Sequence, residues 1–322
     1  MGLGLLALVV NGIDTQGLQR AWMRADWRYL LTALLPVLGG SLFRALRWRL
    51  LHRPRYYPSL RATLASVLAG QLVNLVVPFR AGELVRVYYL AELTGSSKLY
   101  SLSTVAIERS LDGLMVLALA GALAPLIVFP DWLRWSGLAS AAAFSVLLAA
   151  MVVGVRFRGV LGRTIRRATE LTPVLDRLGL VRRFQPAADA LDALAEARLI
   201  LVVWGLSCLV WLCGGLVNHL VLLSLGLDLP FSSSLFVLLA LTLGAIVPSL
   251  PWQAGVFETV AVLSLMSFGV DPTTGLAYGL LLHVVALGPP TFLGAFALRY
   301  LEGARAAAEP APETAALKEG VS

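Results

Sequence analysis

The sequence of 322 residues has little charge and few of the side chains that build metal sites or disulfide frameworks. It holds two cysteines, Cys208 and Cys213, which fall within one apolar run, and only three histidines. This usage predicts no disulfide scaffold, no metal site and no cofactor. Charged residues make up 14 % of the chain, whereas soluble globular domains have about 25 %. The composition therefore argues against a soluble protein.

Hydrophobic residues make up 58 % of the chain and gather in long runs. A helix needs about 20 apolar residues to cross a bilayer. The short run 1–10 is interpreted as a first membrane helix, although it is shorter than a full span. Five runs long enough to span follow, at about 29–50, 101–128, 136–154, 199–226 and 273–298. We therefore expect an all-α integral membrane protein, a polytopic helical bundle with about six full spans.

The 26 basic residues outnumber the 19 acidic ones, and they gather between the apolar runs. In a soluble protein this excess would suggest nucleic acid, but here it fits the positive-inside rule, and no nucleic-acid partner is expected. Segments 44–61 and 156–198 are the most basic. Both are assigned to the cytoplasm, the second as an amphipathic linker that lies on the membrane or as a solvated connector. The N- and C-termini then also lie in the cytoplasm, and the protein in the inner (plasma) membrane.

Two further apolar stretches, 62–93 and 232–270, are broken near their middles by proline and glycine, which interrupt helices. Because both basic segments are cytoplasmic, the first stretch makes no net crossing and is predicted to be a re-entrant hairpin. Non-helical backbone at membrane depth is tolerated only where it faces protein or a water-filled cavity. The breaks are therefore candidate sites. They contain Pro78 and Gly82 in the first hairpin, and Pro248, Pro251 and Gly255 in the second.

The chain also shows two similar units, residues about 29–128 and about 199–298, each a span, a broken hairpin and a span. Each hairpin carries a glutamate, and a titratable residue follows 25 positions later: Glu108 after Glu83, and His283 after Glu258. Because the units enter from opposite sides, we predict an inverted repeat, as in many secondary transporters. Residues 1–302 are expected to form a single transmembrane domain, and 303–322 a disordered tail.

The first hairpin carries the motif NLVVPFRAGELVR at 74–86, followed by ERSLD at 108–112. These residues, with the proline/glycine-rich segment that ends at Glu258, resemble the flippase-like membrane domain of lysylphosphatidylglycerol synthases and the stand-alone proteins built from it. The resemblance covers most of 1–300 and implies a bundle that moves a lipid or lipid-linked headgroup between leaflets. Residues 251–254 and His283 depart from the family pattern. No aminoacyl-transferase region follows, so synthase activity is not expected.

A charged side chain at the bilayer centre costs roughly 2.5–3.5 kcal/mol, so it needs a partner or a function. The functional interpretation is a site for an anionic headgroup, because guanidinium groups bind phosphate bidentately. The structural interpretation is ion pairing, with Arg109 and Asp112 as one pair, Glu83 closing the hairpin, and Glu108 paired with Arg80 or Arg86. Glu108 and His283 are also candidate proton carriers. The candidate substrate-binding residues are Arg80, Glu83, Arg86, Glu108, Arg109, Asp112, Glu258 and His283.

The favoured function is a flippase or transporter of an anionic membrane lipid. The alternative is a non-catalytic membrane partner of a lipid-modifying enzyme or glycosyltransferase. An enzyme acting on a lipid phosphate is less favoured, because the sequence has no metal-ligand cluster and no nucleophile–base pair. No catalytic residue is assigned.

Overall fold

The computed structural model describes residues 15–53, 55–77, 81–135, 196–245 and 255–308, with Gln253 and a few isolated positions between 137 and 190. In these ranges the chain forms helices and no strand. The predicted N-terminal run and most of 136–154 and 156–198 lie outside the described residues. The helices are α2 (Thr15–Arg24), α3 (Trp27–His52), α4 (Leu60–Val76), α5 (Gly82–Thr94), α6 (Lys98–Leu123), α10 (Ala197–Ser224), α11 (Phe231–Gly244), α12 (Val256–Met266) and α13 (Pro272–Ala308).

Three of these helices, α3, α10 and α13, are long and apolar enough to cross a membrane. This confirms the prediction of a helical membrane protein. Helix α6 has the same 26-residue length as α3, but three charged residues, Glu108, Arg109 and Asp112, lie in its middle. Leu35 and Leu201 are each 72 % exposed, and large apolar side chains in such positions suit contact with lipid. The central position of these charges distinguishes α6 from the three apolar helices, and they must be satisfied inside the protein.

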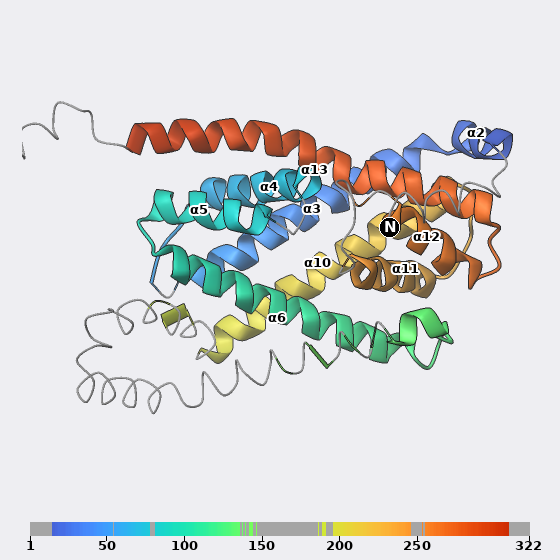
Figure 1. Ribbon diagram of the computed structural model, residues 1–322, viewed down its shortest axis with the longest axis horizontal. Coiled ribbons are helices and arrows are strands. Elements are labelled where there is room, and N and C mark those ends of the chain that lie inside the picture. Colours follow the sequence, from blue (N-terminus) through green and yellow to red (C-terminus); the bar gives the residue numbers. More distant parts are fainter. Residues whose placement is uncertain are drawn as a thin grey trace, which may run out of the picture.

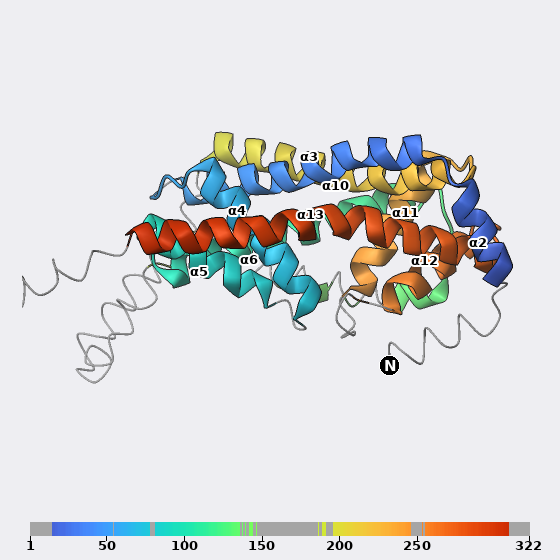
Figure 2. The ribbon, with the colours of Figure 1, turned by 90° about the horizontal axis from the view of Figure 1, so that it is seen from above.

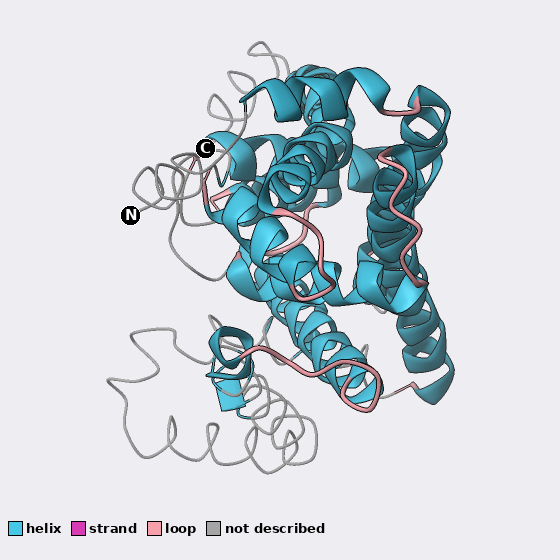
Figure 3. Ribbon diagram, turned by 90° about the vertical axis from the view of Figure 1, so that its right-hand side faces the viewer, coloured by secondary structure: helices cyan, strands magenta, loops and turns pink. Residues whose placement is uncertain are grey.

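The described helices follow the order long, short, short, long twice: α3, α4, α5, α6 and then α10, α11, α12, α13. The four long helices run roughly along the long axis of the molecule (Figure 1). The short pairs α4–α5 and α11–α12 lie toward opposite ends of that axis in both Figure 1 and Figure 2. Viewed along the axis, the described helices form a bundle (Figure 3).

The two halves are packed into each other rather than side by side. Helix α3 of the first half makes its most extensive contacts with α10 of the second, and α13 of the second half packs on α4 of the first. One apolar cluster, which includes Val37, Val221 and Tyr278, joins α3, α10 and α13. Residues between the halves are therefore positioned by helices of both halves.

Both predicted hairpins are interrupted. Helix α4 ends at Val76 and α5 begins at Gly82, so Glu83 lies in the first turn of α5, and Pro78 lies outside the described residues. Helix α11 ends at Gly244 and α12 begins after Gly255, whose φ of +86° places it in the region that favours glycine. Pro248 and Pro251 lie outside the described residues.

The C-terminal boundary differs from the prediction. We expected a disordered tail from residue 303, but α13 continues to Ala308. Alanine has the highest helix propensity of any residue, and four alanines among residues 304–308 favour continuation of the helix.

Helices α4 and α5 approach closely at two glycines, Gly70 and Gly82. The Gly82 amide donates a hydrogen bond to Asn74 Oδ1 at 2.8 Å. A Cβ on Gly70 would lie 2.8 Å from the Gly82 carbonyl oxygen, and a Cβ on Gly82 would collide with the Gly70 carbonyl oxygen. The first hairpin therefore requires glycine at position 82.

Gly82→Ala should destabilise the protein by about 1–3 kcal/mol or more, because backbone rather than a movable side chain meets the added methyl group. The matched control is Gly121→Ala in α6, where nothing lies within 4 Å of an added Cβ. That change should be neutral or stabilising, since alanine is the better helix former. Thermal unfolding of the purified variants in detergent measures both effects, and equal melting temperatures would contradict the close approach.

Candidate functional site: a charge ring and the cavity beside it

Arg47 lies on α3 and is completely buried. Its Nη2 donates to Glu108 Oε1 at 2.7 Å, and its Nη1 donates to Asp112 Oδ1 at 2.7 Å and to Ser207 Oγ at 3.0 Å. Glu108 is also completely buried. This one guanidinium group therefore ties α3 to α6 and to α10.

Arg86, on α5, contacts Glu108 from another direction. Its Nη1 lies 2.9 Å from Glu108 Oε2, and its Nη2 lies 2.6 Å from Glu83 Oε2. The guanidinium group also lies over the Trp48 ring, 4.7 Å from its centroid, a cation–π contact that favours the buried charge. Trp48 is held by a 3.0 Å hydrogen bond from its Nε1 to Thr104 Oγ1.

Arg109 closes the arrangement. It contacts Glu83 Oε1 at 2.6 Å and Asp112 Oδ2 at 3.1 Å. The ion pairs thus form a closed ring in which every arginine contacts two carboxylates and every carboxylate contacts two arginines. We call this the charge ring; its members in order are Arg47, Glu108, Arg86, Glu83, Arg109 and Asp112. With all six groups ionised, the ring has no net charge.

The ring contains five of the residues predicted for the site: Glu83, Arg86, Glu108, Arg109 and Asp112. The expected pairs Arg109–Asp112 and Arg86–Glu108 are present. Arg80 lies outside the described residues.

The positions of Arg44 and Arg47 differ from the prediction, which placed both in a cytoplasmic basic segment. They lie within α3, three residues apart, and Arg47 is a ring member. The signal for them was their position inside the apolar run 29–50.

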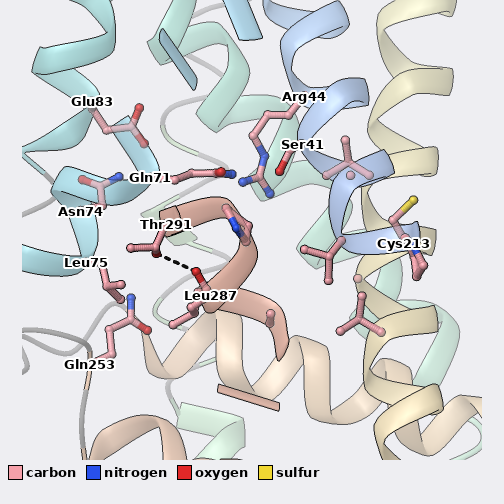
Figure 4. A pocket seen from close by; sticks show the side chains of 18 of the residues that line it. Ser41, Arg44, Gln71, Asn74, Leu75, Glu83, Cys213, Gln253, Leu287 and Thr291 are labelled. Atoms are coloured by element: carbon pink, nitrogen blue, oxygen red, sulfur yellow. Dashed lines mark hydrogen bonds between the residues drawn. The ribbon is translucent and has the colours of Figure 1, made fainter. Parts of the chain in front are cut away.

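A cavity of about 370 Å³ lies beside the ring, between the two halves. Arg44 extends from α3 into it, and Gln71 extends toward Arg44 from α4 (Figure 4). The cavity has polar or charged lining residues on α3, α4, α5, α6, α13 and the second hairpin break: Ser41, Arg44, Gln71, Asn74, Glu83, Arg109, Thr291 and Gln253. Its size falls within the roughly 300–1,000 Å³ of small-molecule sites.

Arg44 lies beside the charge ring but is not a member of it. Within the described ranges, no carboxylate lies within ion-pair distance of its guanidinium group, and no hydrogen bond to it is formed. Glu83 and Arg109, which also line the cavity, are already paired with each other. The charge ring and Arg44 together contain four arginines and three carboxylates, which gives a net charge of +1 at the cavity. The arrangement can bind an anion.

The predicted counterparts in the second half form a separate pair. His283 Nδ1 lies 2.7 Å from Glu258 Oε1, and Glu258 Oε2 accepts a 2.7 Å hydrogen bond from the Gly255 amide. The structure does not bring this pair into the charge ring. Gln253, in the second hairpin break, lines the cavity instead and has a φ of +54°.

Comparison with known proteins gives a family for this chain. Residues 1–294 match the family described as the lysylphosphatidylglycerol synthase TM region. A UPF0104 membrane protein of Methanocaldococcus jannaschii is 23 % identical over 281 residues, which cover 84 % of each chain. A UPF0104 membrane protein of Archaeoglobus fulgidus is 24 % identical over 302 residues, which cover 86 % of this chain and 88 % of the relative. No solved structure matches.

Arg47→Gln should destabilise the protein by about 3–5 kcal/mol, because it leaves Glu108 and Asp112 buried with one cation fewer. The control is Arg134→Gln, which removes the exposed Arg134–Asp131 pair and should cost less than about 1 kcal/mol. Unfolding of both variants in detergent compares the two losses. A loss for Arg47→Gln no larger than that of the control would show that the ring does not stabilise the fold.

Proposed function

This chain belongs to the lysylphosphatidylglycerol synthase TM region family, and we propose that it is a flippase, a transporter that moves an anionic lipid or lipid-linked headgroup between membrane leaflets. The observation that carries the proposal is the unpaired Arg44 in the cavity between the two halves. A cation in the membrane is costly unless it has a partner. A lipid phosphate supplies that partner, because its oxygens match the guanidinium fork.

The order of long and short helices, which is the same in both halves, supports the same function. In transporters with inverted repeats, the substrate site lies where interrupted helices of the two repeats meet. Here Asn74, two residues before the end of α4, and Gln253, in the second break, line the same cavity. We therefore propose that α4–α5 and α11–α12 are re-entrant hairpins in an inverted repeat of a single transmembrane domain with about six full spans.

Contacts at one end of the molecule support the proposed topology. Arg55 Nη2 lies 2.8 Å from Asp189 Oδ1, so one residue from each of the two most basic segments lies on the same side of the bundle. When Arg44 and Arg47 are left out, residues 49–61 still carry four arginines and no acid. The positive-inside rule then assigns this side to the cytoplasm. We propose a plasma-membrane protein with cytoplasmic termini.

An enzymatic role has less support in the site. An acid–base catalyst needs a side chain free to exchange a proton, whereas Glu83, Glu108 and Asp112 each contact two arginines. Freeing one of them would break the charge ring. A transporter requires only that the cavity bind and release its substrate.

Transbilayer movement of labelled lipids in proteoliposomes tests the proposal. The panel should span anionic, zwitterionic and polyprenyl-phosphate headgroups, with and without a proton gradient. Arg44→Gln should lower the transport of anionic lipids about 10–100-fold, since hydrogen bonds to charged groups contribute about 1.5–3 kcal/mol and each 1.4 kcal/mol is tenfold. Arg44→Lys should be intermediate, because it keeps the charge but loses the bidentate geometry.

The matched control is Arg28→Gln, an exposed arginine on the same helix, which should leave transport unchanged. Movement lost equally in both variants would contradict a specific role for Arg44. No movement of any lipid by folded wild-type protein would refute the flippase and favour a non-catalytic partner of a lipid-modifying enzyme.

A further inference from the structure

A second cavity, of about 330 Å³, begins where the first one ends. It lies between α6, α10 and α11, which pack against one another. The two cavities share four lining residues: Arg44, Arg109, Val210 and Gly214. They therefore meet at the unpaired cation.

The first cavity has a mixed lining of polar and apolar residues, and the second cavity is the more apolar of the two. The first cavity holds Gln71, Asn74 and Gln253 on its far side. Beyond Arg109 and Asp112, the second cavity is lined by apolar side chains, except for Thr242, whose hydroxyl donates to the Leu238 carbonyl at 2.8 Å. The apolar lining consists of Val116, Val210, Trp211, Leu238 and Leu243. A polar headgroup there would find few partners, whereas a hydrocarbon chain needs none.

We propose that the second cavity holds the hydrocarbon chain of the lipid whose anionic headgroup binds at Arg44. This inference rests on the proposed function and specifies how the site divides its substrate. The phosphate lies at the junction, the rest of the headgroup in the first cavity, and the chain between α6, α10 and α11. The site thus recognises one amphiphile, and a free phosphate or a neutral hydrocarbon satisfies only half of it.

Gly214 keeps the junction open. It lines both cavities, and a Cβ at this position would lie 3.1 Å from Leu238 Cδ2. A branched side chain here would push into the passage between the two cavities. The absence of a side chain at Gly214 thus allows Leu238 of α11 to pack closely on α10 beside the junction.

Trp211 provides a direct reporter of chain position. In the purified full-length protein, 8-bromooctyl phosphate should quench tryptophan fluorescence saturably, because bromine on the chain end quenches a nearby indole. The specific part of the quenching should be absent in Trp211→Phe. Octyl phosphate should compete at least tenfold better than butyl phosphate, since each buried methylene contributes about 0.8 kcal/mol relative to water. Arg44→Gln should weaken binding at least tenfold.

A second variant separates the chain from the headgroup. Gly214→Val should lower the affinity for octyl phosphate more than that for butyl phosphate, and so reduce the difference between the two. The control Leu212→Phe lies on the same helix at a position that is 46 % exposed, and it should change neither affinity.

The outcomes distinguish the inference from the function on which it rests. Arg44-dependent binding with no quenching of Trp211, or with equal affinity for butyl and octyl phosphate, would overturn the chain site and leave the flippase standing. An absence of Arg44-dependent binding for every alkyl phosphate would overturn the chain site as well. In that case, lipid movement by wild-type protein in proteoliposomes would still decide the function separately.

Discussion

The closed charge ring is the interaction on which the rest of this structure depends. Its six members come from α3, α5 and α6, and a hydrogen bond from Arg47 to Ser207 extends it to α10. Desolvation can exceed the attraction within a buried ion pair, so such a pair adds little net stability, but loss of one partner is strongly destabilising. In a ring, every member has two partners. Glu83 lies in the first turn of α5, so the ring also fixes where the first hairpin resumes its helix.

The ring explains why a single arginine determines the charge of the cavity. Because its three arginines and three carboxylates balance, Arg44 remains as the uncompensated charge beside it. Interactions between charges strengthen as the dielectric constant falls, so this charge acts strongly on any ligand that enters. Arg44 also stands where the two cavities meet. The Arg44 side chain therefore lies between the first cavity and the more apolar second cavity.

Much of the helical pattern could be predicted from the sequence, because long apolar runs and proline–glycine breaks are local signals. The runs 29–50 and 199–226 correspond to α3 and α10, and both hairpins are interrupted where expected. The pairing of charges depends on three-dimensional proximity. Arg47 bonds Glu108, 61 positions away, and the positive-inside rule had assigned it to a loop. The 25-residue spacing corresponds to a direct contact between Glu258 and His283, whereas Arg86 bridges Glu83 and Glu108.

The two halves are held by different forces, and this difference limits how the molecule can move. Separating α5 from α6 would leave buried charges unpaired. The second half holds the Glu258–His283 pair between α12 and α13, but otherwise packs mainly through apolar side chains and small residues, as where Gly244 meets Val260 and Gly279 meets Ala261. Lipid tails are as apolar as leucine, so sliding of such contacts in a bilayer meets no hydrophobic penalty. A rearrangement that opens the cavity to one leaflet and then to the other therefore costs least if α11, α12 and α13 shift against an intact charge ring.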